Sequence, residues 1–89
     1  MTTQTLRIVN EKGLHARASA KFVEVVEAHD ADAEVRKDGL SVAGESIMGL
    51  LMLAASRGTS IEVSTSGPEA AALAEALDVL VANRFGEDY

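Results

Sequence analysis

The stretch Gly13-Leu14-His15-Ala16-Arg17-Ala18-Ser19 marks the place where the sequence changes from a strand pattern to a helix pattern. Before it, residues 5–9 alternate polar and apolar side chains, with Leu6 and Ile8 on one face, which predicts a half-buried strand. After it, residues 16–28 carry apolar side chains at helical spacing. We expect the helix to present Ala16, Ala20, Val23 and Glu27 on one side, with Phe22, Val25 and Val26 widening its apolar stripe.

The rest of the chain continues this alternation of strand and helix patterns. Asp38-Gly39 favours a tight hairpin turn between two short strands. Ser46 is a candidate N-cap for an apolar helix, and Gly58 lies in the segment that ends it. The elements expected after the first helix are strands at 33–36 and 40–43, a helix at 47–55, a strand at 61–64 and a helix at 68–83.

The resulting order of elements is β-α-β-β-α-β-α. Strands with one apolar face and helices with one apolar stripe bury these surfaces by packing as two layers. We therefore predict an α+β fold, a two-layer open-faced sandwich with a four-stranded, mainly antiparallel sheet and three helices on one face. A length of 89 residues suits a single domain spanning residues 1–89.

The composition argues against several classes of function. A formal net charge of −6 repels nucleic acids at long range, so we predict no general nucleic-acid binding. The chain has no cysteine, and its two histidines lack the spacing of a metal site, so we predict no metal centre. The longest apolar run, 47–55, is far shorter than the roughly 20 residues that cross a bilayer. Because the N-terminus also lacks a signal-peptide pattern, we expect a cytoplasmic protein without a membrane partner.

His15 stands at the start of the first expected helix, in a window that is locally positive. Residues 12–23 hold Lys12, Arg17 and Lys21 but no acidic residue. The start of a helix offers unpaired N–H groups and the positive end of its dipole, which together favour an anion. An imidazole there could act as a nucleophile toward a phosphoryl group, with Arg17 neutralising its charge. Taken alone, however, a histidine at a helix start is more often a cap or a surface residue, and His29 fits that simpler interpretation.

A resemblance to a known family adds what spacing alone does not show. Lys12-Gly13-Leu14-His15-Ala16-Arg17, with Phe22-Val23, closely resembles the phosphohistidine signature of the HPr family. These proteins are phosphocarriers of the phosphoenolpyruvate-dependent phosphotransferase system. Ser46-Ile47-Met48-Gly49-Leu50 resembles the regulatory-serine motif of the same family. The separation of the two motifs, the order of elements and the length also agree with the family over essentially the whole chain.

The resemblance implies a role for several residues. His15 would accept a phosphoryl group through Nδ1 from phosphorylated enzyme I and pass it to an EIIA domain, while Arg17 stabilises the phosphate. Ser46 would be phosphorylated by an ATP-dependent HPr kinase/phosphorylase, which lowers carrier activity. The protein would be a relay intermediate without a cofactor, not an independent enzyme.

We expect the two partners to dock on an apolar surface beside His15, formed by Ala20, Ile47, Met48 and Leu51. We also expect the protein to be a monomer. Flexible methionine is favoured at surfaces that adapt to more than one partner.

Some positions depart from the family pattern. Ala18 stands where proline is usual, and Glu45 precedes Ser46 where a non-acidic residue is usual. The acidic tail carries Glu87 and Asp88, and the sequence leaves open whether either carboxylate reaches Arg17.

Two alternatives stay open at the level of sequence. Within the phosphotransferase system, the chain could serve sugar uptake or a nitrogen-regulatory branch. In a different class, it could be a small α+β regulatory module that binds a metabolite or a protein without chemistry, because sandwiches of this kind host many functions.

Overall fold

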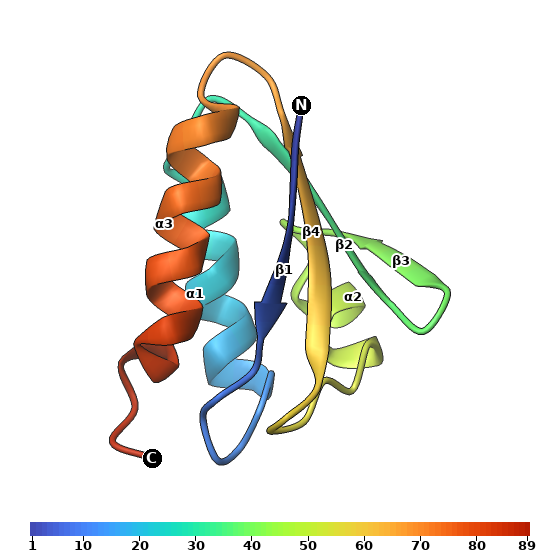
Figure 1. Cartoon of the computed structure of the whole chain (residues 1–89), viewed down its shortest axis with the longest axis vertical. Helices are drawn as coiled ribbons and strands as arrows, with labels where there is room; N and C mark the ends of the chain where they lie inside the picture. Colours follow the sequence, from blue (N-terminus) through green and yellow to red (C-terminus); the bar gives the residue numbers. More distant parts are fainter.

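The computed structural model describes all 89 residues, and its order of elements confirms the predicted one (Figure 1). The strands and helices are β1 (Thr2–Arg7), α1 (Ala16–Glu27), β2 (Asp32–Lys37), β3 (Leu40–Ala43), α2 (Ile47–Met52), β4 (Ser60–Ser66) and α3 (Ala70–Ala82). A short 3₁₀ turn, η1 (Arg84–Gly86), follows α3.

The four strands form one sheet in the order β1-β4-β2-β3, and all neighbouring strands are antiparallel. Leu6 pairs with Ile61 and Val35 with Val63, so apolar side chains of adjacent strands line up on the buried face. Asp38 and Gly39 both have positive φ, as the predicted two-residue hairpin turn requires. The three helices cover one face of the sheet, with α1 and α3 side by side, which confirms the open-faced sandwich (Figure 1).

The buried face of α1 agrees with the predicted apolar stripe at Phe22, Val23 and Val26 and differs from it at its edges. Phe22 is fully buried, together with Ala18 and Val26 one turn away on either side, whereas Ala16 and Glu27 are exposed. The largest side chain of the helix therefore decides which face packs, because it buries the most apolar area. The spacing of apolar residues in the sequence identifies an apolar stripe, but it does not show which of its side chains are buried most deeply.

The first strand begins and ends earlier than predicted. β1 spans Thr2–Arg7 because Thr2 and Thr3 pair with Thr65 and Ser64 of β4, although these N-terminal residues show no apolar alternation. Ile8 lies beyond the strand and is still fully buried, since its backbone bonds with Gly58 and Thr59. Polar strand ends of this kind are formed by backbone pairing, which a hydrophobic pattern does not reveal.

The second helix is shorter than predicted, because α2 ends at Met52 and the apolar run continues as a turn to Ala55. Ala54 takes a positive φ of 50°, and Leu53 and Ala55 are buried on either side of it. The carbonyl of Ala55 accepts a hydrogen bond from Leu14 N at 2.8 Å. The end of the run thus supports the loop before α1 instead of extending α2.

The third helix starts later than predicted, because α3 begins at Ala70 and not at Pro68.

None of the helices is long and apolar enough to cross a membrane.

Candidate functional site

His15 is the N-cap residue of α1, as the sequence predicted. Its backbone is extended (φ −79°, ψ −176°), and its side chain makes no capping hydrogen bond to the helix. The side chain is 28% exposed. The imidazole is therefore not used as a cap and projects into a region where the first N–H groups of the helix favour negative charge.

The loop that leads into His15 is fixed by close packing and hydrogen bonds. Gly13 has a φ of +66°, and a Cβ there would lie 2.4 Å from the carbonyl oxygen of Ala55, so only glycine fits. Asn10 Nδ2 donates to Gly13 O at 2.8 Å, and Ser19 Oγ donates to Leu14 O at 3.3 Å. These contacts hold the start of α1 in place without a proline in its first turn.

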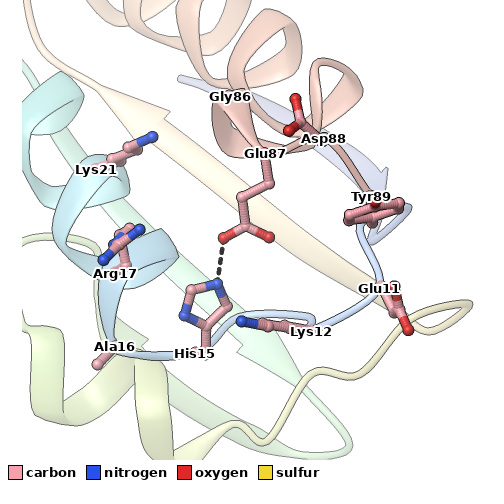
Figure 2. A pocket seen from close by; sticks show the side chains of 10 residues that line it. All are labelled: Glu11, Lys12, His15, Ala16, Arg17, Lys21, Gly86, Glu87, Asp88 and Tyr89. Carbon is pink, nitrogen blue, oxygen red and sulfur yellow. Dashed lines mark hydrogen bonds and ion pairs between the residues drawn. The ribbon is translucent and has the colours of Figure 1, made fainter.

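The His15 side chain lines a cleft of about 590 Å³ (Figure 2). The β1–α1 loop and the C-terminal tail, which supply its lining residues, lie at the same end of the molecule (Figure 1). Figure 2 shows the ring beneath Glu87, with Arg17 and Lys12 on either side of it. The charged residues around the cleft are the cations Lys12, Arg17 and Lys21 and the acids Glu11, Glu87 and Asp88. The locally positive window of the sequence is therefore a mixed-charge site in three dimensions, since the tail brings acidic groups back to it.

The tail folds back onto this site because Phe85 is fully buried in the core. Lys21 Nζ donates to the carbonyl of Phe85 at 2.7 Å, and Glu11 N donates to the carbonyl of Tyr89 at 3.0 Å. Phe85 itself has a φ of 54°, in the left-handed region that costs free energy for a residue with a side chain. Burial of the aromatic ring offsets that cost and anchors the residues that follow.

Glu87 contacts His15, and not Arg17. One carboxylate oxygen, Oε2, is bonded to His15 Nε2, and the other, Oε1, accepts a hydrogen bond from Asn10 Nδ2 at 3.0 Å. The Arg17 side chain is exposed and takes part in no hydrogen bond or ion pair. Sequence reasoning missed Glu87 as a site residue. The available signal was Phe85, an apolar aromatic residue at the start of the acidic tail in a chain with only 3% aromatics.

The surroundings of Glu87 favour its ionised form. Burial of the carboxyl would by itself raise its pKa. Hydrogen bonds from Asn10 and His15, together with the charges of His15 and Lys12, outweigh burial and hold the pKa below its ordinary value of 4.5. Glu87 is consequently a carboxylate at neutral pH.

This lowered pKa predicts how stability depends on pH. Because the unfolded state binds the Glu87 proton more tightly, the stabilising effect of Glu87 is complete above about pH 4.5 and is lost as the pH falls through its folded-state pKa. We expect Glu87→Gln to cost about 1 kcal/mol at neutral pH and progressively less toward pH 3. Urea unfolding of both proteins across this range measures the difference. A difference that grows on acidification contradicts the assignment.

Ser46 is the N-cap of α2, as predicted, and its Oγ accepts a hydrogen bond from Gly49 N at 3.0 Å. Beyond it, Leu50 is fully buried and anchors the helix, while apolar side chains on its other faces are exposed. Those exposed side chains are Ile47 (40%), Met48 (71%), Leu51 (37%) and Met52 (65%). Ala20, on the neighbouring helix α1, is half-buried. The predicted apolar surface is thus exposed, and Met52 extends it.

The remaining histidine has a local structural role. His29 Nδ1 donates to the carbonyl of Val25 at 2.8 Å just beyond the end of α1, as the simpler interpretation of this residue expected. No group of three or more His, Asp or Glu side chains is arranged to hold a metal ion.

Fold and site together define a small α+β protein with a cleft built around a part-exposed histidine at the start of its first helix. A family model described as "PTS HPr component phosphorylation site" matches residues 2–83. The chain therefore belongs to the HPr family of the phosphotransferase system.

Its relatives cover nearly the whole chain. Phosphocarrier protein HPr of Neisseria meningitidis (serogroup A) is 45% identical over 87 residues, which cover 98% of each chain. Phosphocarrier protein NPr of Escherichia coli K12 is 36% identical over 86 residues, which cover 96% of each. A crystal structure of HPr from Thermoanaerobacter tengcongensis matches with a TM-score of 0.94 at 35% identity, covering 100% of both chains.

Proposed function

We propose that this protein is a phosphocarrier of the phosphoenolpyruvate-dependent phosphotransferase system. His15 accepts a phosphoryl group from phosphorylated enzyme I and passes it to an EIIA domain. The observation that carries this proposal is the placement of His15, 28% exposed at the N-cap of α1, in a cleft that also holds Lys12, Arg17 and Lys21. The protein is a covalent intermediate in the relay and needs no cofactor.

The charges around His15 suit a phosphoryl group. Arg17 is exposed and unpaired, so its guanidinium is free to bind phosphate oxygens with a forked pair of hydrogen bonds. Lys12 is likewise exposed on the rim of the cleft. Together with the start of α1, these cations balance the negative charge of the group as it arrives and leaves.

Both partners dock on the exposed apolar face of α2 in this proposal. Ile47, Met48 and Leu51 supply the surface, with Ala20 of α1 at its edge. A contiguous exposed apolar cluster usually marks an interaction site, whereas single apolar residues scattered over a surface are common and need no explanation. The protein acts in the cytoplasm as a monomer with a single domain. The same exposed surface can then bind enzyme I and the EIIA domain in turn.

Ser46 is the proposed site of regulation by an HPr kinase/phosphorylase. Its Oγ already accepts from Gly49 N, so a phosphate there leaves the helix start with an acceptor. The added charge of about −2 would lie next to Ile47 and Met48, beside the negative charge of Glu45. Phosphorylation would in this way weaken docking without unfolding α2.

Labelling with phosphate tests these proposals. Incubation with enzyme I and labelled phosphoenolpyruvate should label the protein, and the label should be lost in acid, since phosphohistidine is acid-labile and phosphoserine is not. Omission of enzyme I is the control. An unlabelled protein would instead support the alternative, a module that binds a metabolite or protein without chemistry.

A second labelling experiment tests Ser46. After incubation with the kinase and labelled ATP, the label should be acid-stable and absent from Ser46→Ala. Its persistence in that variant rules out Ser46.

A further inference from the structure

We propose that Glu87, held by Asn10, is the positioning residue of His15. Its carboxylate keeps the imidazole proton on Nε2, leaves the Nδ1 lone pair free for the phosphoryl group, and balances the positive charge of the ring after transfer. This inference rests on the proposed function and adds to it a residue from the opposite end of the chain.

The geometry joins three residues in one chain of contacts. Asn10 is fully buried, and its Nδ2 donates both to Gly13 O at 2.8 Å and to Glu87 Oε1 at 3.0 Å. Glu87 Oε2 is bonded to His15 Nε2, and the Glu87 side chain is 18% exposed (Figure 2). One buried amide thereby ties the loop before α1 to the tail and aims the carboxylate at the ring.

The charge of Glu87 decides which ring nitrogen carries the proton. An ionised carboxylate only accepts hydrogen bonds, so His15 Nε2 must be the donor. A neutral imidazole has one N–H, and the lone pair therefore lies on Nδ1. Nδ1 makes no hydrogen bond to any protein group, so it is free to attack.

The transfer then needs no proton to leave the ring. The Nδ1 lone pair attacks the phosphorus of the donor's phosphohistidine, forming the Nδ1–P bond. The donor's N–P bond breaks, and its electron pair returns to the donor's nitrogen. The His15 ring keeps its Nε2–H and becomes positively charged, next to the Glu87 carboxylate. A carboxylate stabilises the imidazolium of a hydrolase triad in the same way. When the phosphoryl group leaves, its bonding pair returns to Nδ1 and the neutral ring is restored.

The Glu87→Gln substitution separates this role from simple packing. Asn10 Nδ2 requires an acceptor, so the carbonyl oxygen of the substituted side chain should face Asn10 and its amide NH₂ should face His15. The amide would then donate to Nε2 and move the ring proton to Nδ1, which blocks the nucleophile. We therefore expect Glu87→Gln to be at least as harmful as Glu87→Ala, although glutamine fills the same space.

The experiment combines nitrogen NMR of the His15 ring with the rate of phosphoryl uptake from phosphorylated enzyme I. At alkaline pH the wild-type ring should be protonated at Nε2, Glu87→Ala should give a mixture, and Glu87→Gln should favour Nδ1–H. Uptake should slow by roughly ten- to a hundredfold in both variants, less than for a fully buried triad carboxylate. Glu75→Gln removes the same charge from an exposed site on α3 and should match wild type in both measurements. Both Glu87 variants should stay folded, because buried Phe85 anchors the tail.

The outcomes distinguish this inference from the proposed function. A wild-type ring protonated at Nδ1, or a Glu87→Gln variant with wild-type tautomer and rate, overturns the role of Glu87. If wild type takes up no label while the tautomer still depends on Glu87, the phosphocarrier function fails and the positioning of the ring stands.

Discussion

His15→Ala is expected to reduce phosphoryl uptake from phosphorylated enzyme I by at least about a thousandfold, because it removes the only nucleophile in the cleft that the relay can use. The fold should survive, since the His15 side chain does not cap α1 and its hydrogen bond is to Glu87 in the tail. Acid-labile label per chain, with stability from urea unfolding on the same samples, measures both quantities.

His29→Ala is the matched control, because it removes the only other histidine of the chain. His29 lies beyond the opposite end of α1, where its Nδ1 is bonded to Val25 O at 2.8 Å. This variant should take up label at the wild-type rate and lose about 1 kcal/mol of stability at most. Full labelling of His15→Ala, or loss of labelling in His29→Ala, would show that His15 is not the phosphoryl acceptor.

Phe85→Ala is expected to lower the free energy of unfolding by about 3–5 kcal/mol, which is a large part of the stability of a domain this small. Phe85 is fully buried in the core formed with α1 and α3, and truncation would leave a cavity there. The midpoint of urea unfolding measures the loss. Tyr89→Ala, at a position that is 74% exposed in the same tail, should change stability by less than about 0.5 kcal/mol.

The same substitution should also release the tail from the site. Without the buried ring, only hydrogen bonds from Asn10, Glu11 and Lys21 hold the tail, so Glu87 should lose its contact with His15. The His15 ring signal of Phe85→Ala should then resemble that of Glu87→Ala. Phe85→Leu retains most of the buried apolar volume and should preserve the contact. A tail that stays on His15 in Phe85→Ala would show that the hydrogen bonds from Asn10, Glu11 and Lys21 hold it without the aromatic ring.

Much of the fold follows from local patterns in the sequence. The strand and helix order, the Asp38-Gly39 hairpin and the caps Ser46 and His15 were all predicted, because each depends on residues within a few positions of one another. Hydrophobic periodicity gave wrong bounds where strand pairing or side-chain size has the larger effect on the structure. Backbone pairing with β4 sets the bounds of β1 at Thr2–Arg7, and burial of the large Phe22 side chain sets which face of α1 packs on the core.

The site divides in the same way. The sequence alone determined that a histidine follows a tight turn at the start of a helix, close to Arg17, since both features lie within the stretch 13–19. Only the tertiary structure decided that Glu87, 72 residues away, lies against that histidine and that Asn10 holds it there. The physical reason is that the tail has no periodic pattern of its own. Its path depends on the pocket that buries Phe85, and that pocket exists only after α1 and α3 have packed on the sheet.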